Sequence, residues 1–289
     1  MERLKPKDPE RIGPWELVNR LGSGGMGIVY MGTNGTKTAA IKVIREFLLD
    51  DPTSRARLER EVKSLRSIRS RNVAEIIDDD VVSTPAWIAT RFIDGPSLNS
   101  LVETQGPLNE KEWRDLALGL TSAAAAVHKA GIIHRDIKPS NILLSPNGPV
   151  LIDFGISFSS DATSLTRTGL VAGTPAWFAP EQFESKNITT SVDDFAIGSV
   201  LYFAATGKIP WGDEDTSVAN LMHKILTDFA DLSKLNDLQK LVISELHIKS
   251  PKERLSSSKA HSKLTSQEAI TLHNKMKKNY FPKPNKLFT

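Results

Sequence analysis

The chain has 289 residues, 39 % hydrophobic and 25 % charged, the composition of a soluble globular protein with one large domain or two ordinary ones. Its 37 Lys and Arg residues against 34 Asp and Glu leave a net charge of +3, too small to argue for a nucleic-acid partner. The absence of cysteine excludes disulfides, thiolate metal sites and cysteine nucleophiles. The N-terminus lacks an apolar signal-peptide core, and the longest apolar run, 196–205, is shorter than the about 20 residues of a membrane span. These features predict a cytoplasmic protein.

The first ninety or so residues are predicted to form mainly strands, from apolar runs at 15–18, 28–31 and 38–44. Between the first two runs, 22–29 matches the pattern G-x-G-x-x-G-x-V. The glycines alone are consistent with an ordinary hairpin turn, or with a dinucleotide site if a helix followed. Because a strand resumes at Ile28 instead, the pattern favours a flexible hairpin whose backbone amides cover phosphates.

The third strand carries Lys42 among apolar residues. Taken alone, this pattern fits two interpretations about equally well: a lysine at a sheet edge whose ammonium group reaches solvent, or a lysine with a functional role. The segment from Pro52 is predicted to be a helix with Leu58 and Val62 on one face. Glu61 lies at the edge of that face, and a partly desolvated carboxylate is costly without a cation. We therefore expect an ion pair between Lys42 and Glu61 that aims the ammonium group at nucleotide phosphates.

After 94–96 the pattern changes to helices, with helical spacing over 112–129 and an almost wholly apolar, hence buried, helix over 192–206. The change predicts an α+β protein with two lobes, the first rich in strands and the second mainly helical. The expected divisions are an N-terminal extension over 1–11, the first lobe over 12–94, the second over 95–275 and a basic C-terminal tail over 276–289.

Residues with catalytic chemistry gather at 134–141 and again at 153–155. Asp136 can accept the proton of an attacking hydroxyl while Lys138 neutralises charge on a transferred phosphoryl group. Asn141 and Asp153 supply oxygen atoms of the kind that magnesium binds. Either motif alone is more often a strand end and a turn, but their order and spacing predict phosphoryl transfer.

The loop that begins at Asp153 and ends with 173–181 is long for a compact domain, and such loops are usually functional or disordered. Its many hydroxyl side chains are consistent with a merely solvated loop. Phosphorylation is the functional interpretation, because a phosphate would add charge that can pair with a nearby arginine and order the segment. The hydroxyl residues are Ser157, Ser159, Ser160, Thr163, Ser164, Thr166 and Thr168.

On these residues the chain resembles the protein kinase superfamily and, more narrowly, the bacterial eukaryotic-like (Hanks-type) serine/threonine kinases, over roughly 12–272. The resemblance implies the bilobal kinase fold, with helix C in the small N-lobe. It implies ATP as phosphoryl donor, with Mg²⁺, for which Mn²⁺ can substitute. Expected partners are protein substrates and a second copy of the chain, autophosphorylated in trans. Because many relatives continue through a membrane helix into a sensor domain, the chain is either free-standing or excised from such a receptor.

The resemblance also implies roles for individual residues. Catalytic roles fall to Lys42, Glu61, Asp136 as base, Lys138, Asn141 and Thr174. The nucleotide site comprises Leu21, Gly22, Ser23, Gly24, Gly25, Met26, Gly27, Val29, Ala40, Lys42, Thr90, Arg91, Ile93, Leu143 and Asp153, with Thr90 as gatekeeper and Arg91 and Ile93 as adenine partners. Asn141 and Asp153 are the metal ligands, and Thr166 and Thr168 the phosphorylation sites. Glu181 is expected to pair with Arg254, and Asp193 to brace the catalytic loop.

Two other functions fit parts of this pattern. Small-molecule phosphotransferases, such as the antibiotic and choline kinases, share the fold but lack a peptide-binding segment like 173–181. Kinase-fold binding scaffolds usually lose a key Lys, Asp or Asn, and here Lys42, Asp136, Asn141 and Asp153 are all present. Three departures from the family pattern, Met26, Arg91 and 70–72 without the customary His-Pro, remove no catalytic group.

Overall fold

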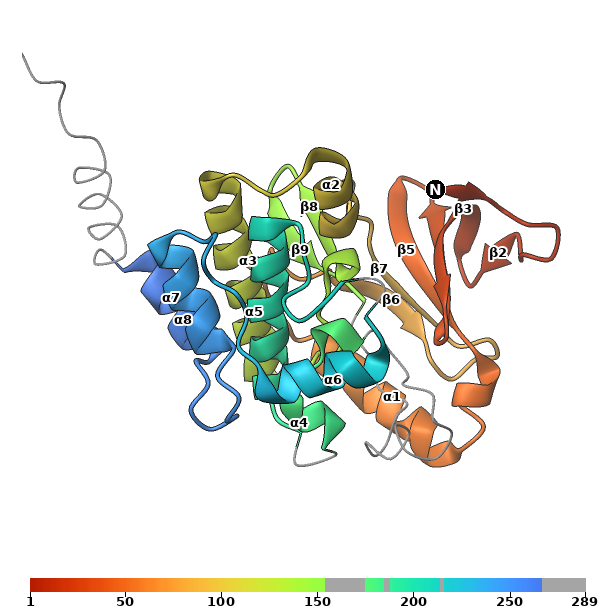
Figure 1. The fold of residues 1–289 in the computed structure, drawn as a ribbon. Coiled ribbons are helices and arrows are strands. Elements are labelled where there is room, and N and C mark those ends of the chain that lie inside the picture. Colours follow the sequence, from red (N-terminus) through yellow and green to blue (C-terminus); the bar gives the residue numbers. More distant parts are fainter. Residues whose placement is uncertain (154–174, 185–187, 214–215, 267–289) are drawn as a thin grey trace, which may run out of the picture.

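The computed structural model describes residues 1–153, 175–184, 188–213 and 216–266, with a strand-rich part beside a helical part (Figure 1). The strand-rich part is a seven-stranded sheet in the order β1-β3-β4-β5-β7-β6, with β2 also paired to β3. Its strands are β1 Glu2–Arg3, β2 Arg11–Ile12, β3 Trp15–Gly24, β4 Gly27–Asn34, β5 Lys37–Ile44, β6 Ile76–Asp80 and β7 Trp87–Arg91.

The three predicted strands are confirmed as β3, β4 and β5, and every pairing within the sheet is antiparallel. The first twelve residues add two short strands that the sequence did not predict. Glu2 lies opposite Arg20 and Ile12 opposite Trp15, so both strands extend the sheet along β3.

Helix α1, Pro52–Leu65, begins as predicted at Pro52. The Asp51 carboxylate accepts hydrogen bonds from the backbone N–H groups of Thr53 and Ser54, both at 3.1 Å, and so caps two of the donors that a helix start leaves unpaired. The predicted apolar face is buried. In Figure 1 this helix lies below the sheet.

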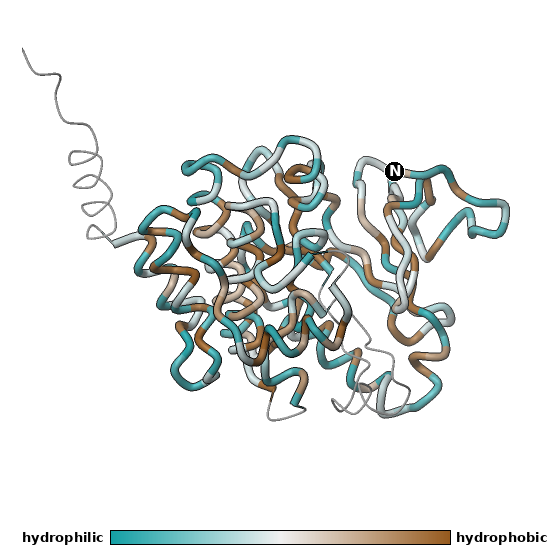
Figure 2. Tube along the Cα trace, in the orientation of Figure 1, coloured by the Kyte–Doolittle hydropathy of each residue, from teal (hydrophilic) through white to brown (hydrophobic). Residues whose placement is uncertain are grey.

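The helical part is built around α5, whose residues from Ser191 to Ala204 are all buried, as predicted. It packs against α3 and α7, and hydrophobic residues concentrate inside this bundle (Figure 2). The helices are α2 Leu98–Gln105, α3 Glu110–Lys129, α4 Pro180–Phe183, α5 Ser191–Thr206, α6 Val218–Thr227, α7 Asp237–Leu246 and α8 Ser257–Thr265. This part also contains a hairpin of β8 Ile142–Ser145 and β9 Gly148–Leu151 and short 3₁₀ helices at Pro139–Asn141 and Pro175–Trp177. A third 3₁₀ helix, Glu46–Leu48, follows β5.

One hydrophobic core joins the two parts. It contains Leu58 and Val62 from α1, Leu120 from α3 and Ile197 from α5. The chain between α1 and β6 is also bonded to the β8–β9 hairpin, because the buried Asn72 donates from Nδ2 to the Pro149 carbonyl at 2.8 Å. Within the described part of the chain, no helix is long and apolar enough to cross a membrane.

Candidate active site

Asp136, Lys138 and Asn141 lie together in the loop between α3 and β8. Lys138 Nζ is 2.9 Å from Asp136 Oδ2. The Asn141 amide donates from Nδ2 to the Asp136 carbonyl at 2.8 Å and to Asp136 Oδ2 at 2.9 Å. Because both donors of the amide face Asp136, its oxygen Oδ1 is turned away from that carboxylate. The loop therefore fixes the Asp136 carboxylate between the Lys138 ammonium and the Asn141 amide.

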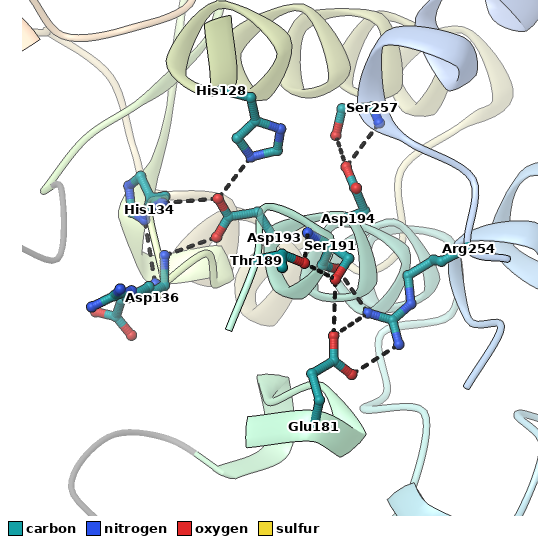
Figure 3. A network of polar contacts seen from close by, with 11 residues as sticks. His128, His134, Asp136, Glu181, Thr189, Ser191, Asp193, Asp194, Arg254 and Ser257 are labelled. Atoms are coloured by element: carbon teal, nitrogen blue, oxygen red, sulfur yellow. Dashed lines mark hydrogen bonds and ion pairs between the residues drawn. The ribbon is translucent and has the colours of Figure 1, made fainter. Parts of the chain in front are cut away.

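The loop is braced from below by Asp193, a carboxylate on α5 that is 1 % exposed. It accepts from the backbone N–H of His134 and of Arg135, each at 2.8 Å, and contacts His128 Nε2 at 2.8 Å (Figure 3). Arg135 is held at a φ of 64°, in the left-handed region that non-glycine residues seldom adopt. The predicted bracing role of Asp193 is confirmed.

His134 links the catalytic loop to the strand end before Asp153. Its Nε2 is 3.2 Å from the Ile152 carbonyl, which can only accept, while its Nδ1 accepts from the Asp136 backbone N–H at 3.4 Å. These partners require the neutral Nε2–H form of the imidazole. Burial agrees with this, since it lowers the pKa of His134 below its ordinary value.

Lys42 reaches the loop side of the site through an ion pair with Asp153 Oδ1. Asp153 has a φ of 55°, so it is the second residue of the site, after Arg135, with left-handed backbone. Glu61 is half-buried on α1. The expected ion pair between Lys42 and Glu61 stays a prediction.

The glycine-rich hairpin of β3 and β4 is held against β5. A Cβ on Gly27 would lie 2.1 Å from the Val43 carbonyl oxygen, whereas Cβ atoms on Gly24 and Gly25 would meet nothing within 4 Å. Arg45, just after β5, donates from Nε and Nη2 to the Gly24 carbonyl at 3.3 and 3.1 Å. The backbone at the turn is therefore open on one side and anchored on the other. Of the predicted nucleotide residues, Leu21, Gly22, Ser23 and Gly24 end β3, Gly25 and Met26 form the turn, and Gly27 and Val29 lie in β4.

The predicted adenine site combines the sheet with the β8–β9 hairpin. Ala40 and Thr90 are register partners in β5 and β7, and Thr90 Oγ1 donates to the Ala40 carbonyl at 3.4 Å. Arg91 ends β7 and is exposed, and Ile93 is buried in a small cluster against which Leu143 packs. The contacts of these groups with adenine stay predictions.

The family model described as Protein kinase domain matches residues 15–267. The chain belongs to the protein kinase family. The predicted resemblance to bacterial serine/threonine kinases is also confirmed. The chain is 41 % identical over 244 residues to the probable serine/threonine-protein kinase PkwA of Thermomonospora curvata, covering 84 % of this chain and 33 % of that protein. It is 39 % identical over 247 residues to the serine/threonine-protein kinase AfsK of Streptomyces griseus, covering 84 % and 30 %.

The chain thus spans about a third of the length of these curated relatives. Among solved structures, Rad53 1–466 in complex with AMP-PNP aligns with a TM-score of 0.72 at 22 % identity, covering 86 % of this chain and 64 % of that chain. This likeness confirms the predicted kinase fold.

A buried ion pair joins Glu181 on α4 to Arg254, which lies between α7 and α8. Arg254 donates from Nη1 to Glu181 Oε1 at 2.6 Å and from Nη2 to Oε2 at 3.0 Å, a bidentate pair (Figure 3). The Arg254 side chain is 0 % exposed, and its Nη1 also donates to the Ser191 carbonyl at 2.8 Å. The predicted pairing of Glu181 with Arg254 is confirmed, and it ties α4 to α5.

Three predicted site residues, Thr166, Thr168 and Thr174, lie outside the described residues, as does the whole basic tail over 276–289. Lys263 on α8, which precedes that tail, pairs with Glu245 Oε2 at 2.6 Å.

The sequence reasoning missed His128, which completes the set of groups around Asp193. A lone histidine in the last turn of a helix carries no signal of its own, because its partner lies sixty-five residues away in sequence.

Proposed function

We propose that this kinase domain transfers the γ-phosphoryl group of ATP to serine and threonine hydroxyls of proteins. The observation that carries the proposal is the Asp136 carboxylate, held by Lys138 and Asn141 on a loop that Asp193 braces. A positioned carboxylate can accept the proton of the attacking hydroxyl, and the adjacent ammonium can neutralise the phosphoryl group in flight.

The nucleotide is expected under the glycine-rich hairpin. The space beside Gly24 and Gly25 supports this placement, because it lets backbone amides approach phosphates without side chains in the way. Lys42 is expected to contact the phosphates when a metal ion shares the Asp153 carboxylate. Ala40, Thr90, Ile93 and Leu143 supply apolar and backbone surface for the adenine.

The residues fit a magnesium ion, for which manganese can substitute. Asn141 Oδ1 is turned away from Asp136, and Asp153 contributes a carboxylate, so both donors are the oxygen atoms that Mg²⁺ prefers. Mg²⁺, when bound, neutralises charge on the phosphates during transfer. Asn141 also keeps the base in place through its amide hydrogens.

Protein substrates are supported by the relatives described above, since both are named serine/threonine-protein kinases. Autophosphorylation in trans at Thr166 and Thr168 is part of the proposal.

Mass spectrometry of residues 165–174 tests this function. After incubation with ATP and magnesium, we expect phosphate on Thr166 or Thr168 in the parent chain and none in Asp136→Asn. If the parent binds nucleotide but neither labels itself nor phosphorylates added proteins, a binding scaffold replaces the proposal. If it consumes ATP only with a small metabolite, a small-molecule phosphotransferase does.

A further inference from the structure

A buried carboxylate lies outside the active site, in the N-terminal segment. Asp8 has a side chain that is only 2 % exposed. Arg20 donates to both of its oxygens, from Nε to Oδ2 at 2.6 Å and from Nη2 to Oδ1. The Tyr30 hydroxyl donates to Oδ1 at 3.0 Å, and the Lys5 backbone N–H donates to Oδ2 at 2.7 Å. We call Asp8, Arg20 and Tyr30 the N-terminal clamp.

The clamp lies at the base of the glycine-rich hairpin. Arg20 in β3 and Tyr30 in β4 are register partners, so Asp8 connects the two strands at the same level. The register of the hairpin shifts between Arg20 and Gly22, immediately beyond the clamp. Such an irregularity bends a strand and increases its twist, so it sets the angle at which the glycines leave the sheet.

The N-terminal segment is fixed at several points along β3. Its strands pair with both halves of β3, and Ile12 joins the core of the sheet, with Leu4 packed against that core. The kinase-family match begins only at residue 15, after this segment. The clamp therefore couples a part of the chain outside that match to the hairpin inside it.

We propose that Asp8 is a positioning residue for phosphoryl transfer, which holds the base of the glycine-rich hairpin so that its turn covers the ATP phosphates. The proposal rests on the proposed function in one respect, that the hairpin covers ATP. The bidentate pair fixes the distance and the orientation of the Arg20 guanidinium relative to the Asp8 carboxylate. The Tyr30 hydroxyl holds the same carboxylate from the neighbouring strand β4. Two strands tied at one level cannot slide or splay independently, which limits the positions that the turn beyond them can adopt.

The clamp keeps its hydrogen bonds because Asp8 stays ionised and Tyr30 stays protonated. The Arg20 hydrogen bonds hold the pKa of the Asp8 carboxyl well below its ordinary range, so this carboxylate stays ionised at every physiological pH. Burial raises the pKa of Tyr30, so its hydroxyl keeps the proton that it donates. The cation of Arg20 also lies 5.8 Å from the centre of the Tyr30 ring.

The test compares Asp8→Asn with a matched control in the same lobe, Asp79→Asn, which breaks the ion pair between Arg66 and Asp79 on the far side of the sheet. For Asp8→Asn we expect the KM for ATP to rise about three- to tenfold with kcat changed less than about twofold, because a misplaced hairpin binds ATP less well in the ground state and in the transition state alike. We expect Tyr30→Phe to give a smaller rise, because it removes one of the hydrogen bonds to Asp8. Asp79→Asn should leave the KM unchanged. All rates are measured below the thermal transition of every variant.

Hydrogen exchange of the amides at 22–27, without nucleotide, tests the same idea independently of catalysis. We expect faster exchange there in Asp8→Asn and not in Asp79→Asn. Unchanged exchange and unchanged KM in Asp8→Asn would reduce the clamp to a stabilising contact and overturn the proposal. Faster exchange in a chain that binds no ATP would instead uphold the clamp and reject the proposed function.

Discussion

Asp136 owes its position to side chains from separate parts of the sequence. Asn141 and Lys138 come from its own loop, but Asp193, which holds the backbone of that loop, comes from α5. Local spacing predicted that Asp136, Lys138 and Asn141 share one site, but not the contacts between them. The bracing role of Asp193 followed from the family resemblance alone, because no local pattern links residues fifty-seven or more positions apart. His128 had no signal of either kind.

Asp194, the neighbour of Asp193, provides a residue-scale prediction. It is buried on α5 and accepts from both the backbone N–H of Ser257, at 2.8 Å, and its hydroxyl (Figure 3). Burial raises the pKa of Asp194 above the ordinary 3.8. The folded state therefore binds more protons than the unfolded state between these two pKa values, and the free energy of unfolding falls as pH rises through that interval.

We expect Asp194→Asn to lose this pH dependence. The Asn oxygen can still accept from Ser257, while its buried NH₂ group adds a cost of about 1–3 kcal/mol that does not depend on pH. Urea denaturation between pH 4 and 7 should show the variant gaining on the parent as pH rises. A stability difference that stays constant over this range would contradict the raised pKa.

At the scale of elements, the sequence predicted the three central strands and the helices α1, α3 and α5, because their periodicity is strong. It missed β1 and β2, since two-residue strands have no periodic pattern to detect. It also missed the clamp, since the Lys, Pro and Glu residues around Asp8 are typical of a solvent-exposed terminus. Pairing with β3, a tertiary effect, gives this segment its structure.

The glycine-rich hairpin gives a prediction at this scale. Gly27 has no room for a Cβ against the Val43 carbonyl, so Gly27→Ala must push β4 away from β5. We expect it to lower the free energy of unfolding by about 1–3 kcal/mol, the usual cost of overpacking. Gly24→Ala is the matched control, because its Cβ meets open space. Thermal denaturation should separate the two, and equal losses would refute the packing argument.

At the scale of the whole molecule, the two parts share one hydrophobic core. The segment after α1 adds backbone bonds to the β8–β9 hairpin, from Leu151 N–H to the Asn72 carbonyl at 2.8 Å and from Ala74 N–H to the Leu151 carbonyl at 3.0 Å. The sequence lacks the family's customary His-Pro here, but the Asn72 side chain bonds this segment to the hairpin through the Pro149 carbonyl. Because the core is shared, we expect both lobes to unfold together.

Asn72→Ala tests that continuity. It removes the Nδ2 donor to the Pro149 carbonyl, and an unsatisfied buried carbonyl costs about 1–3 kcal/mol. We expect hydrogen-exchange protection to fall in β4 and β5 and equally in α3 and α5. The control Asn99→Ala, whose side chain donates to Glu103 on the surface of α2, should change neither. Loss of protection confined to the sheet would mean that the lobes unfold separately.

Asp136 is the proposed base for phosphoryl transfer to protein hydroxyls. Its role is tested by the rate of phosphate transfer from ATP to a protein substrate in single-turnover conditions, with ATP binding measured separately, for the parent and Asp136→Asn. We expect the variant to bind ATP as the parent does and to transfer phosphate about 10² to 10⁴ times more slowly, the range for a lost general base. Equal transfer rates in the two chains would contradict that role.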